Sequence, residues 1–550
     1  MRQGKRNRGG LFLIGLVMGM FLSSCSEFRD EQASFLQRPT LATTVTTPLP
    51  QPNSPTIAPP TATVTPQPTA TPTPWRIGID SSVPAALLLP IDRLPADQFE
   101  VIDSESNTEL NLNLNKGETI AEYIYAAVAP FPTIKDDVLI TELQQAELYA
   151  TAETAAVWQT IYPNLQIVEK DKLVETLWAN RNAFAIVPFD ALTPDLKVMH
   201  LEGQSPLDRE LDLASYPLVL RVGASGDEVA IAKLRQALGP ITNRDTEKMT
   251  KIAMTGVTAL VRATAAQMEY SGILFPGEVV GPILQSADVA HISNEVPFAE
   301  NCPFPNAVSA SVVFCSRDSY FELLEYLGAD VIEVTGNHSN DYGTDAMLRS
   351  LDKYLEAGMN YYGGGRDLND SFQPAFVYDH GNKIAFIGCN SFGPYAAWAT
   401  ADLPGTAPCG DMSKMTEEIG LLAAEGYVVI ATFQYEEIYS YQATPNQQRD
   451  YRLLAEAGAA AVSGSQSHHP QAFDFKDGAY IHYGLGNLFF DQMNSLGTRQ
   501  MFIDNYIVYD GRLISVELWT GLIEYYSRPR EMTPAEREAL LNSVFRASGW

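Results

Sequence analysis

The densest group of chemically useful side chains lies in the second half of the chain, directly after an apolar run at 331–334. Gly336, Asn337 and His338 follow this run. A glycine lets the backbone turn tightly, an asparagine supplies a carbonyl oxygen, and a histidine nitrogen can coordinate a metal or donate a proton. Because open α/β sheets bind ligands at the carboxyl ends of their strands, we predict a ligand site here. The alternative is that Asn337 and His338 only cap the next helix.

Other polar side chains occupy corresponding positions after apolar runs of the same region. They are Glu295, Gln434, Gln466, His468, His469 and Asn487. We expect Glu295, Asn337, His338 and His468 to converge at one edge of a two-sheet sandwich, because all four follow apolar strand runs. His482 stands inside an alternating run, and we interpret it as a strand histidine rather than a site residue.

The first residues are typical of an exported chain. Basic residues at 2, 5, 6 and 8 precede an apolar run at 11–22 that is shorter than the about 20 residues of a membrane-spanning helix. The run ends in Leu22-Ser23-Ser24-Cys25, which resembles a lipobox. We therefore expect a signal peptide over 1–24, a lipidated N-terminus over 25–38 beginning at Cys25, and an extracytoplasmic protein held to the membrane by lipid. The alternative is an ordinary secretory signal that contains a cysteine.

Composition then divides the chain. Residues 39–74 are mostly Pro and Thr without charge, so they cannot form a core and are predicted to be an extended linker. The remainder of the 550 residues is long enough for two or three domains. The formal net charge of −29 makes the general surface unsuited to nucleic acid, and we expect no such partner, although an acidic surface also simply keeps exported proteins soluble.

Four cysteines remain beyond Cys25. Export permits disulfides, and the short separations favour Cys302 with Cys315 and Cys389 with Cys409, although three pairings are possible and free thiols are an alternative. None lies in a Cys-x-x-Cys spacing, so a metal site built from these cysteines is not expected.

The region 75–245 alternates apolar runs with amphipathic stretches, which predicts a smaller α/β domain. Its segment "AFAIVPFDALTPDLKVMH" at 183–200 loosely resembles periplasmic solute-binding domains. Either a binding cleft or a structural spacer would fit this pattern.

The region 246–520 carries five ordered segments with a stronger resemblance. They read "AMTGVTALVRAT" at 253–264, "ADVAHISNEVPFA" at 287–299, "GADVIEVTGNHSNDYG" at 328–343, "GYVVIATFQYEEIY" at 426–439, and "VSGSQSHHPQAF" with "YIHYGLGNLFFDQ" within 462–492. Together they resemble the CapA family of capsule-synthesis or poly-γ-glutamate-associated proteins. The resemblance implies a two-sheet α/β/β/α metallophosphatase-like sandwich, followed here by an expected C-terminal helix in 521–550. It also implies one or two divalent cations that polarise a phosphate and activate water.

The sequence departs from the family pattern at several ligand positions. Val257 stands where the family usually has Asp, and Gln434 and Gln466 replace expected imidazoles. We therefore expect at most one divalent metal. The resemblance implies Asn337, His468 and Glu295 as its ligands, His338 and Glu295 as catalytic groups, and Gln434, Gln466, His469 and Asn487 as polymer or substrate contacts.

Two functions follow from the resemblance. The first is a surface-anchored protein that acts in synthesis or attachment of an anionic envelope polymer such as poly-γ-glutamate, as a metal-dependent hydrolase or transferase. The second is a non-catalytic protein that binds the polymer, or a solute, through a degenerate metallophosphatase site. The expected partners are the membrane, through the lipid, and the polymer or its synthesis machinery.

Overall fold

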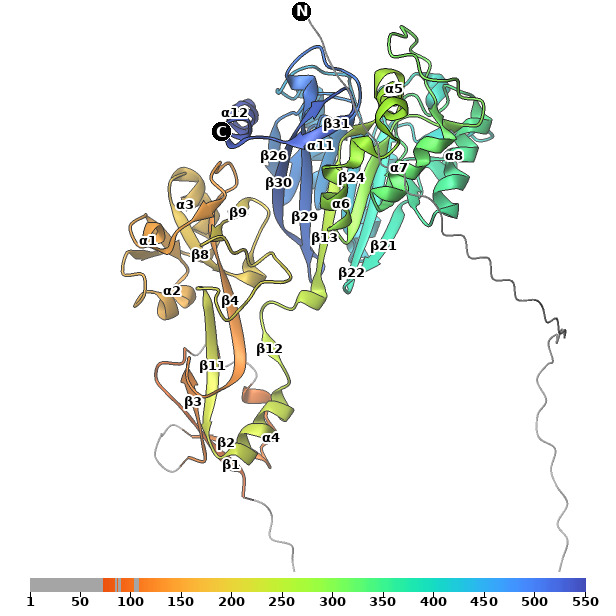
Figure 1. Ribbon diagram of the computed structural model, residues 1–550. Helices are drawn as coiled ribbons and strands as arrows, with labels where there is room; N and C mark the ends of the chain where they lie inside the picture. The colour runs from red at the N-terminus through yellow and green to blue at the C-terminus, as the bar shows by residue number, and fades with distance from the viewer. Residues whose placement is uncertain (1–72, 85–86, 88–90, 103–107) are drawn as a thin grey trace, which may run out of the picture. The chain divides into compact units, whose positions relative to one another are not determined.

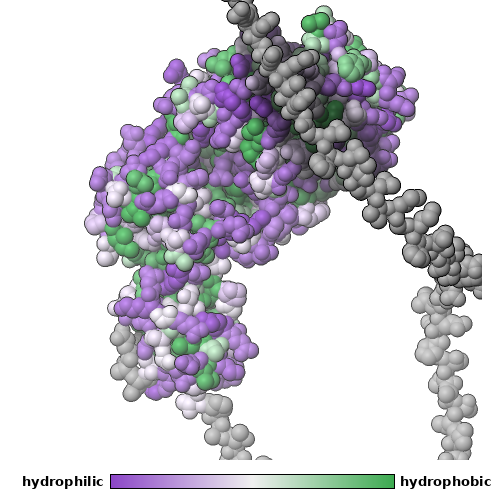
Figure 2. Space-filling view, viewed as in Figure 1, coloured by the Kyte–Doolittle hydropathy of each residue, from purple (hydrophilic) through white to green (hydrophobic). Residues whose placement is uncertain are grey.

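The computed structural model describes residues 73–550 except 85–86, 88–90 and 103–107 (Figure 1). The predicted signal peptide, Cys25 and residues 39–72 of the predicted linker lie outside the described residues. Within the described part of the chain, no helix is both long enough and apolar enough to cross a membrane. On the face drawn in Figure 2, hydrophilic residues predominate and hydrophobic ones form small scattered groups.

The first domain is an α/β unit built on one mixed sheet. Its main strand order is β2-β1-β3-β11-β4-β8-β6-β7. These strands are β1 (Trp75–Ile79), β2 (Phe99–Ile102), β3 (Leu110–Leu114), β4 (Glu118–Pro130), β6 (Leu148–Ala150), β7 (Leu165–Ile167), β8 (Phe184–Pro188) and β11 (Val219–Gly226). The helices are α1 (Ile140–Leu143), α2 (Ala152–Trp158), α3 (Leu173–Ala179) and α4 (Glu228–Leu238). The Asp227 side chain caps α4 by accepting two hydrogen bonds from backbone N–H groups.

The second domain begins with a sheet in the order β19-β18-β15-β13-β29-β30-β31. Its strands are β13 (Met249–Thr255), β15 (Val289–Asn294), β18 (Ala329–Glu333), β19 (Asn360–Tyr362), β29 (Gln500–Tyr509), β30 (Arg512–Glu524) and β31 (Arg528–Glu531). The first four are parallel and the last three are antiparallel. Two short strands, β14 (Val257–Thr258) and β28 (Asn487–Phe489), extend it at the carboxyl end of β15.

The other sheet of this domain has the order β21-β22-β24-β25-β27-β26. Its strands are β21 (Ala375–Asp379), β22 (Asn382–Asn390), β24 (Val428–Gln434), β25 (Ala461–Ser465), β26 (Phe473–Lys476) and β27 (Ala479–His482). Strands β22, β24, β25 and β27 are parallel, so their carboxyl ends share one edge.

Three buried clusters show how the layers pack. Side chains of both sheets, such as Ile252 and Phe386, form one core between them. A second core lies between the first sheet and the helices α5 (Arg262–Ser271), α6 (Val280–Gln285), α7 (Phe321–Tyr326) and α8 (Thr344–Glu356). A third lies between the second sheet and α10 (Ser413–Ala424) and α11 (Pro445–Glu456). The predicted α/β/β/α sandwich, preceded by a smaller α/β domain, is therefore confirmed.

The segment 521–550, which we expected to be helical, contains a helix only in α12 (Pro534–Ala547). Residues 521–524 instead complete β30, and β31 follows. The reason is pairing, because Gly521 and Leu522 bond to β31 on one side and to β29 on the other. Thr533 then starts α12 with a capping box.

Candidate functional site

The predicted site residues lie at the carboxyl ends of strands in both sheets. Glu295 follows β15, and its N–H donates to the carbonyl oxygen of Thr258 at 3.0 Å. Val257 of β14 pairs with Asn487 of β28, and β14 also pairs with β15. The strands β14, β15 and β28 therefore meet at this edge. Gln434 is the last residue of β24, and Gln466 follows β25.

Gly336 brings two of these strand ends together. A Cβ atom at this position would lie 2.6 Å from both the Cα and the carbonyl oxygen of Glu295. Only glycine therefore allows the 336–338 turn to pass so close to Glu295. The close approach places His338 beside that carboxylate, as the sequence predicted for a tight turn.

His338 lies between two carboxylates. Its Nδ1 is 2.6 Å from Asp341 Oδ2 and its Nε2 is 3.8 Å from Glu295 Oε1. Burial alone would lower the pKa of His338, but the hydrogen bond with Asp341 and the charge of Glu295 outweigh burial and raise it. Glu295 is 2% exposed, and its Oε2 has no hydrogen-bond partner among the described residues. This pair thus offers one free acceptor and one imidazole that can hold a proton.

Three amide side chains close on one another beside this pair. The Gln434 Nε2 donates to Asn337 Oδ1 at 3.0 Å and also to Gln466 Oε1. Both N–H bonds of the Gln434 amide are thus used inside the site. We call Asn337, Gln434 and Gln466 the amide cluster. Each amide oxygen has two lone pairs, so Asn337 Oδ1 and Gln466 Oε1 can still accept once more, but their bonds to Gln434 restrict the direction from which a cation or a substrate group can approach.

His468 is oriented by Asn487. Its Nδ1 lies 2.7 Å from Asn487 Oδ1, and its ring stacks on Phe490 at 5.0 Å between centroids. Among the described residues, its Nε2 makes no hydrogen bond, so this nitrogen is left for a ligand. Asn487, expected as a substrate contact, is thus placed to orient an imidazole. His469, also expected as a contact, is buried against Tyr441, and burial lowers its pKa.

Sequence reasoning did not single out an arginine at the rim. Arg262 makes two hydrogen bonds to Asp491 and lies 5.0 Å from the ring centroids of both Phe314 and Phe490. The backbone φ of Arg262 is 44°, in the left-handed region that residues other than glycine rarely adopt. Phe314 in turn contacts the His338 ring at 4.5 Å. The available signal was that Arg262 and Asp491 both stand inside the family-like segments.

A buried carboxyl group beneath the site was also missed. Glu333 accepts hydrogen bonds from Thr335 Oγ1 at 2.6 Å and Ser465 Oγ at 3.1 Å. It thereby connects the two strand ends that lead to Asn337 and Gln466. Burial raises the pKa of Glu333 and lowers that of the neighbouring His291 to about 3, which favours the neutral form of both. A charged residue inside the apolar run 331–334 was the signal.

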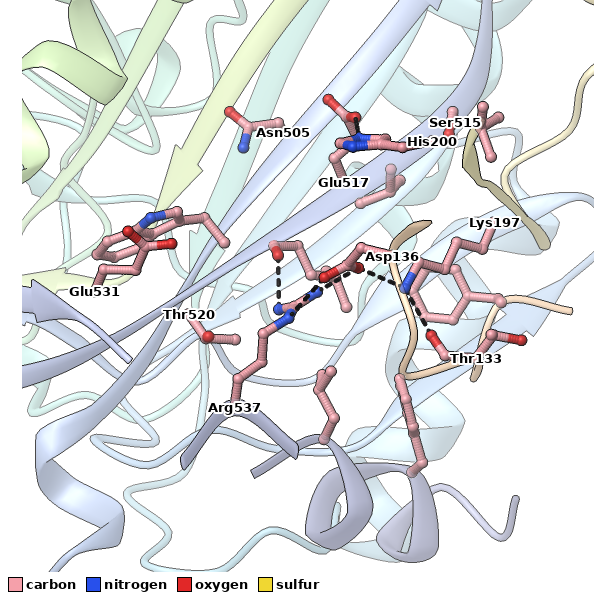
Figure 3. Close-up of a pocket in the computed structure, with 17 residues that line it drawn as sticks. Thr133, Asp136, Lys197, His200, Asn505, Ser515, Glu517, Thr520, Glu531 and Arg537 are labelled. Atoms are coloured by element: carbon pink, nitrogen blue, oxygen red, sulfur yellow. Dashed lines mark hydrogen bonds and ion pairs between the residues drawn. The ribbon is translucent and has the colours of Figure 1, made fainter. Parts of the chain in front are cut away.

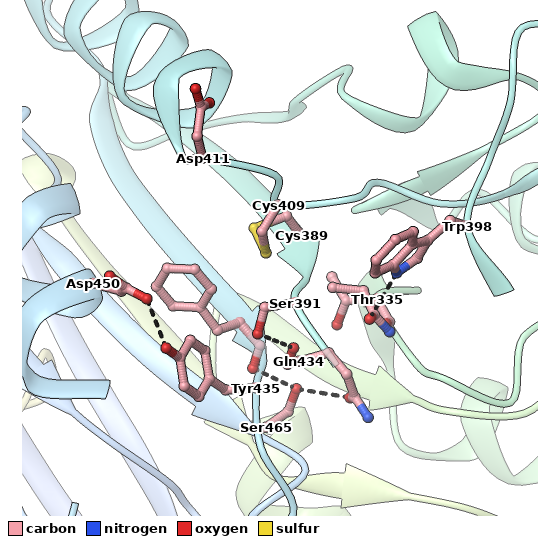
Figure 4. The surroundings of a disulfide bond; sticks show 12 residues. Thr335, Cys389, Ser391, Trp398, Cys409, Asp411, Gln434, Tyr435, Asp450 and Ser465 are labelled. Carbon is pink, nitrogen blue, oxygen red and sulfur yellow. Dashed lines mark hydrogen bonds between the residues drawn. A yellow bond between two sulfur atoms is a disulfide. The ribbon is translucent and has the colours of Figure 1, made fainter. Parts of the chain in front are cut away.

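Both predicted disulfides are present, Cys302 with Cys315 and Cys389 with Cys409. The second lies beside the site, close to Gln434 and Ser465 (Figure 4). Next to it, Asn390 is fully buried and its Nδ2 donates to the carbonyl oxygen of Thr335 at 2.8 Å. The disulfide therefore closes the loop that follows β22 against the turn that carries Asn337 and His338.

The residues present do not fit a two-metal centre. Val257 is a buried alkyl group, and the oxygens of Asn337 and Gln466 already accept hydrogen bonds from Gln434. In the described ranges, the only three His, Cys, Asp or Glu side chains that converge within 4.8 Å are Asp288, Asp379 and His380, outside this site. Glu295 Oε2 has no hydrogen-bond partner among the described residues, but the ligand atoms of Glu295, His338 and His468 do not all lie within 4.8 Å of one another, so these side chains are not already arranged around a single cation.

The sequence of the second domain matches a known protein family. Residues 251–492 match the family described as "Bacterial capsule synthesis protein PGA_cap". The region 251–492 belongs to this family.

Two curated relatives of the capsule synthesis family are similar in sequence. The chain is 23% identical over 261 residues to the "Capsule biosynthesis protein CapA" of Bacillus anthracis, covering 47% of this chain and 63% of the relative. It is 23% identical over 218 residues to the "PGA biosynthesis protein CapA" of Bacillus subtilis (strain 168), covering 39% and 56%. The similarity thus spans less than two thirds of either relative.

A solved structure of a putative 5'-nucleotidase from Staphylococcus aureus, in complex with α-ketoglutarate, is also similar. It shares 11% identity, with a TM-score of 0.34, over 53% of this chain and 58% of that one. With so low a score, the assignment of the sandwich rests on the strand order and the three buried cores described above.

Proposed function

We propose that this protein acts at the outer surface of the cell membrane in synthesis or attachment of an anionic capsule polymer, and that its site binds the polymer rather than cleaves it. Support for the capsule role comes from the family match over 251–492 and the two CapA relatives. Two disulfides support an oxidising, extracytoplasmic location. The expected lipid on Cys25 would provide the anchor.

The amide cluster is the observation that favours binding over cleavage. A two-metal hydrolase needs bridging carboxylate oxygens and several imidazole or carboxylate ligands. Here Val257 supplies no ligand, and the oxygens of Asn337 and Gln466 each accept a hydrogen bond from the Gln434 amide. The site keeps hydrogen-bonding groups suited to a polar chain but lacks the charge that activates water.

One divalent cation would explain how an acidic site holds an anionic polymer. Glu295 Oε2 is buried without a partner among the described residues, and Asp341 adds a second negative charge nearby. A carboxylate polymer would be repelled by these groups unless a cation lay between them. In our proposal the side chains of Glu295, His338 and His468 move together to hold that ion, with Asn337 as a further oxygen ligand if the amide cluster opens.

Binding measurements on the purified exported part of the chain test this proposal. We expect poly-γ-glutamate to bind in excess Mn²⁺, to weaken at least tenfold in EDTA, and to weaken similarly in Glu295→Gln. Glu538→Gln serves as the matched control, since this exposed glutamate lies on α12, outside the site, and its replacement changes the net charge equally. Equal binding with Mn²⁺ and EDTA would contradict the bridging cation. Failure of any polymer binding would contradict the function itself.

A hydrolase or transferase is the second candidate, and the geometry of His338 favours it. The Asp341 hydrogen bond orients the ring, and the raised pKa keeps a proton available to a leaving group. Incubation with poly-γ-glutamate or a simple phosphate ester separates the two functions. If the site is an enzyme, His338→Ala abolishes turnover and keeps metal, whereas His468→Ala loses metal as well. If the site only binds, neither change alters a reaction rate.

A further inference from the structure

A second cavity lies where the first domain meets the sheet of the second domain (Figure 3). Its volume is about 290 Å³, near the lower end of the range for ligand pockets and equal to about ten water molecules at 30 Å³ each. Residues of both domains line it, and it shares no residue with the site described above. We call it the junction cavity.

The cations in the lining already have partners. The ammonium of Lys197 donates to Asp136 at 2.7 Å and to the carbonyl oxygens of Thr133 and Ile134 (Figure 3). The guanidinium of Arg537 donates to both oxygens of Asp136 and to the carbonyl oxygen of Leu518. These groups therefore offer little to an incoming anion.

One buried acceptor in the same lining is left without a donor among the described residues. Asn505 is 6% exposed, lines the cavity, and its Oδ1 has no hydrogen-bond partner among the described residues. Glu517 pairs with Asn505 across β29 and β30, so both side chains lie on one face of the sheet. Glu517 is part-buried and forms ion pairs with His200 Nε2 at 3.9 Å and Lys251 Nζ at 4.0 Å, and its interaction with His200 raises the pKa of that histidine. A buried acceptor without a donor is costly unless a ligand or water supplies one.

The remaining wall is largely aromatic and aliphatic. Trp519 lies on the same face of β30 as Glu517, whereas Phe131, Leu541 and Phe545 line the part of the cavity on the other face, where they pack with Val516 and Leu518. Aromatic faces attract cations through the ring quadrupole, and an apolar wall favours a ligand with a hydrocarbon body over water alone.

We propose that the junction cavity binds a small organic cation, an ammonium or amidinium group carried on an apolar body. The charged group donates hydrogen bonds to Asn505 Oδ1 and the Glu517 carboxylate, and the apolar body lies against Trp519, which is on the same face of β30. The proposal is independent of the polymer-binding function, because it uses none of those residues.

Calorimetric titration of the full exported protein at neutral pH tests this proposal with three phenyl probes of similar size that differ in charge. They are 2-phenylethylammonium, the uncharged 2-phenylethanol and the anionic 3-phenylpropionate. We expect saturable binding of the ammonium at least tenfold tighter than of the alcohol, and no binding of the anion. No saturable binding of the ammonium, or equal or tighter binding of either other probe, would overturn the proposal.

Two variants locate the binding. Glu517→Gln and Asn505→Leu should each weaken the binding of 2-phenylethylammonium at least fivefold. Glu538→Gln is the matched control, because this exposed glutamate lies on α12 outside the cavity lining and its loss changes the net charge equally. Circular dichroism establishes that each variant is folded. If Glu517→Gln binds the ammonium as the control does, the cavity is not the site and the proposal fails.

Discussion

The candidate site and the junction cavity each pair most of their polar groups but leave a different kind of acceptor unpaired. In the site, Gln434 donates to the oxygens of Asn337 and Gln466, and the carboxylate oxygen Glu295 Oε2 has no partner among the described residues. In the cavity, Asp136 accepts from both Lys197 and Arg537, and the amide oxygen Asn505 Oδ1 has no donor among the described residues. The difference teaches that family membership does not show where a chain is ready to bind, because readiness depends on which donors and acceptors are already paired.

Val257→Asp should test this contrast most strongly, by adding a second buried carboxylate to the site that already holds Glu295. Without metal, a buried unpaired carboxylate should lower the free energy of unfolding by about 3–5 kcal/mol. Excess Mn²⁺ should restore most of that loss, as measured by chemical unfolding with Mn²⁺ or with EDTA. Val429→Asp is the control, because Val429 is equally buried but lies in the apolar core between the second sheet and its helices, where metal should not help. Loss without rescue in Val257→Asp would mean that residue 257 does not face the site.

Removing the disulfide beside the amide cluster tests how far that region depends on cross-linking. Replacing Cys389 and Cys409 by Ser should lower the free energy of unfolding by about 3 kcal/mol, because the loop gains freedom in the unfolded chain. Urea unfolding measures the loss, and the Cys302→Ser, Cys315→Ser pair provides the comparison. Stability equal to that of the unaltered protein would show that the loop is held by Asn390 and its neighbours alone.

The cations of the junction cavity predict a pH dependence. Burial lowers the pKa of Lys197 to about 8, against the opposing effect of Asp136. Between that value and the ordinary pKa, the unfolded chain binds more protons at Lys197 than the folded one, so stability rises with pH across this window. The unaltered protein should therefore gain on the order of 1–3 kcal/mol relative to Lys197→Met between about pH 7.5 and pH 10.5. Parallel curves for the two proteins would contradict the lowered pKa.

The smallest expected effect concerns Glu333, whose raised pKa favours a neutral carboxyl group. Glu333→Gln should then change the free energy of unfolding by less than about 1 kcal/mol, because an amide can keep both hydrogen bonds. Glu333→Leu should cost about 1–3 kcal/mol, because the hydroxyls of Thr335 and Ser465 lose their acceptor. Equal costs for Gln and Leu would indicate that Glu333 is charged.

Much of the architecture could be predicted from the sequence. The apolar runs near 331 and 428 fixed the strand ends, and local cysteine spacing gave the disulfides. The C-terminal segment could not, because residues 521–524 and β31 form strands only through pairing with distant partners. The positions of Glu295 and His338 could be predicted, because both residues follow strand ends and Gly336 allows a tight turn before His338. The hydrogen bond from Gln434 to Gln466 could not be predicted, because contact between residues 32 apart depends on packing that sequence spacing does not describe.

Phe131, at the end of β4, has a further consequence. Its ring belongs to the first domain but contacts Phe473, Phe475 and Tyr480 inside the core of the second. Met249 and Tyr509 of the second domain are in turn part of the first domain's core. Each domain thus completes its neighbour's interior, so neither can be transplanted into another protein as an independent module. An experiment that separates them at residue 245 would study two damaged halves.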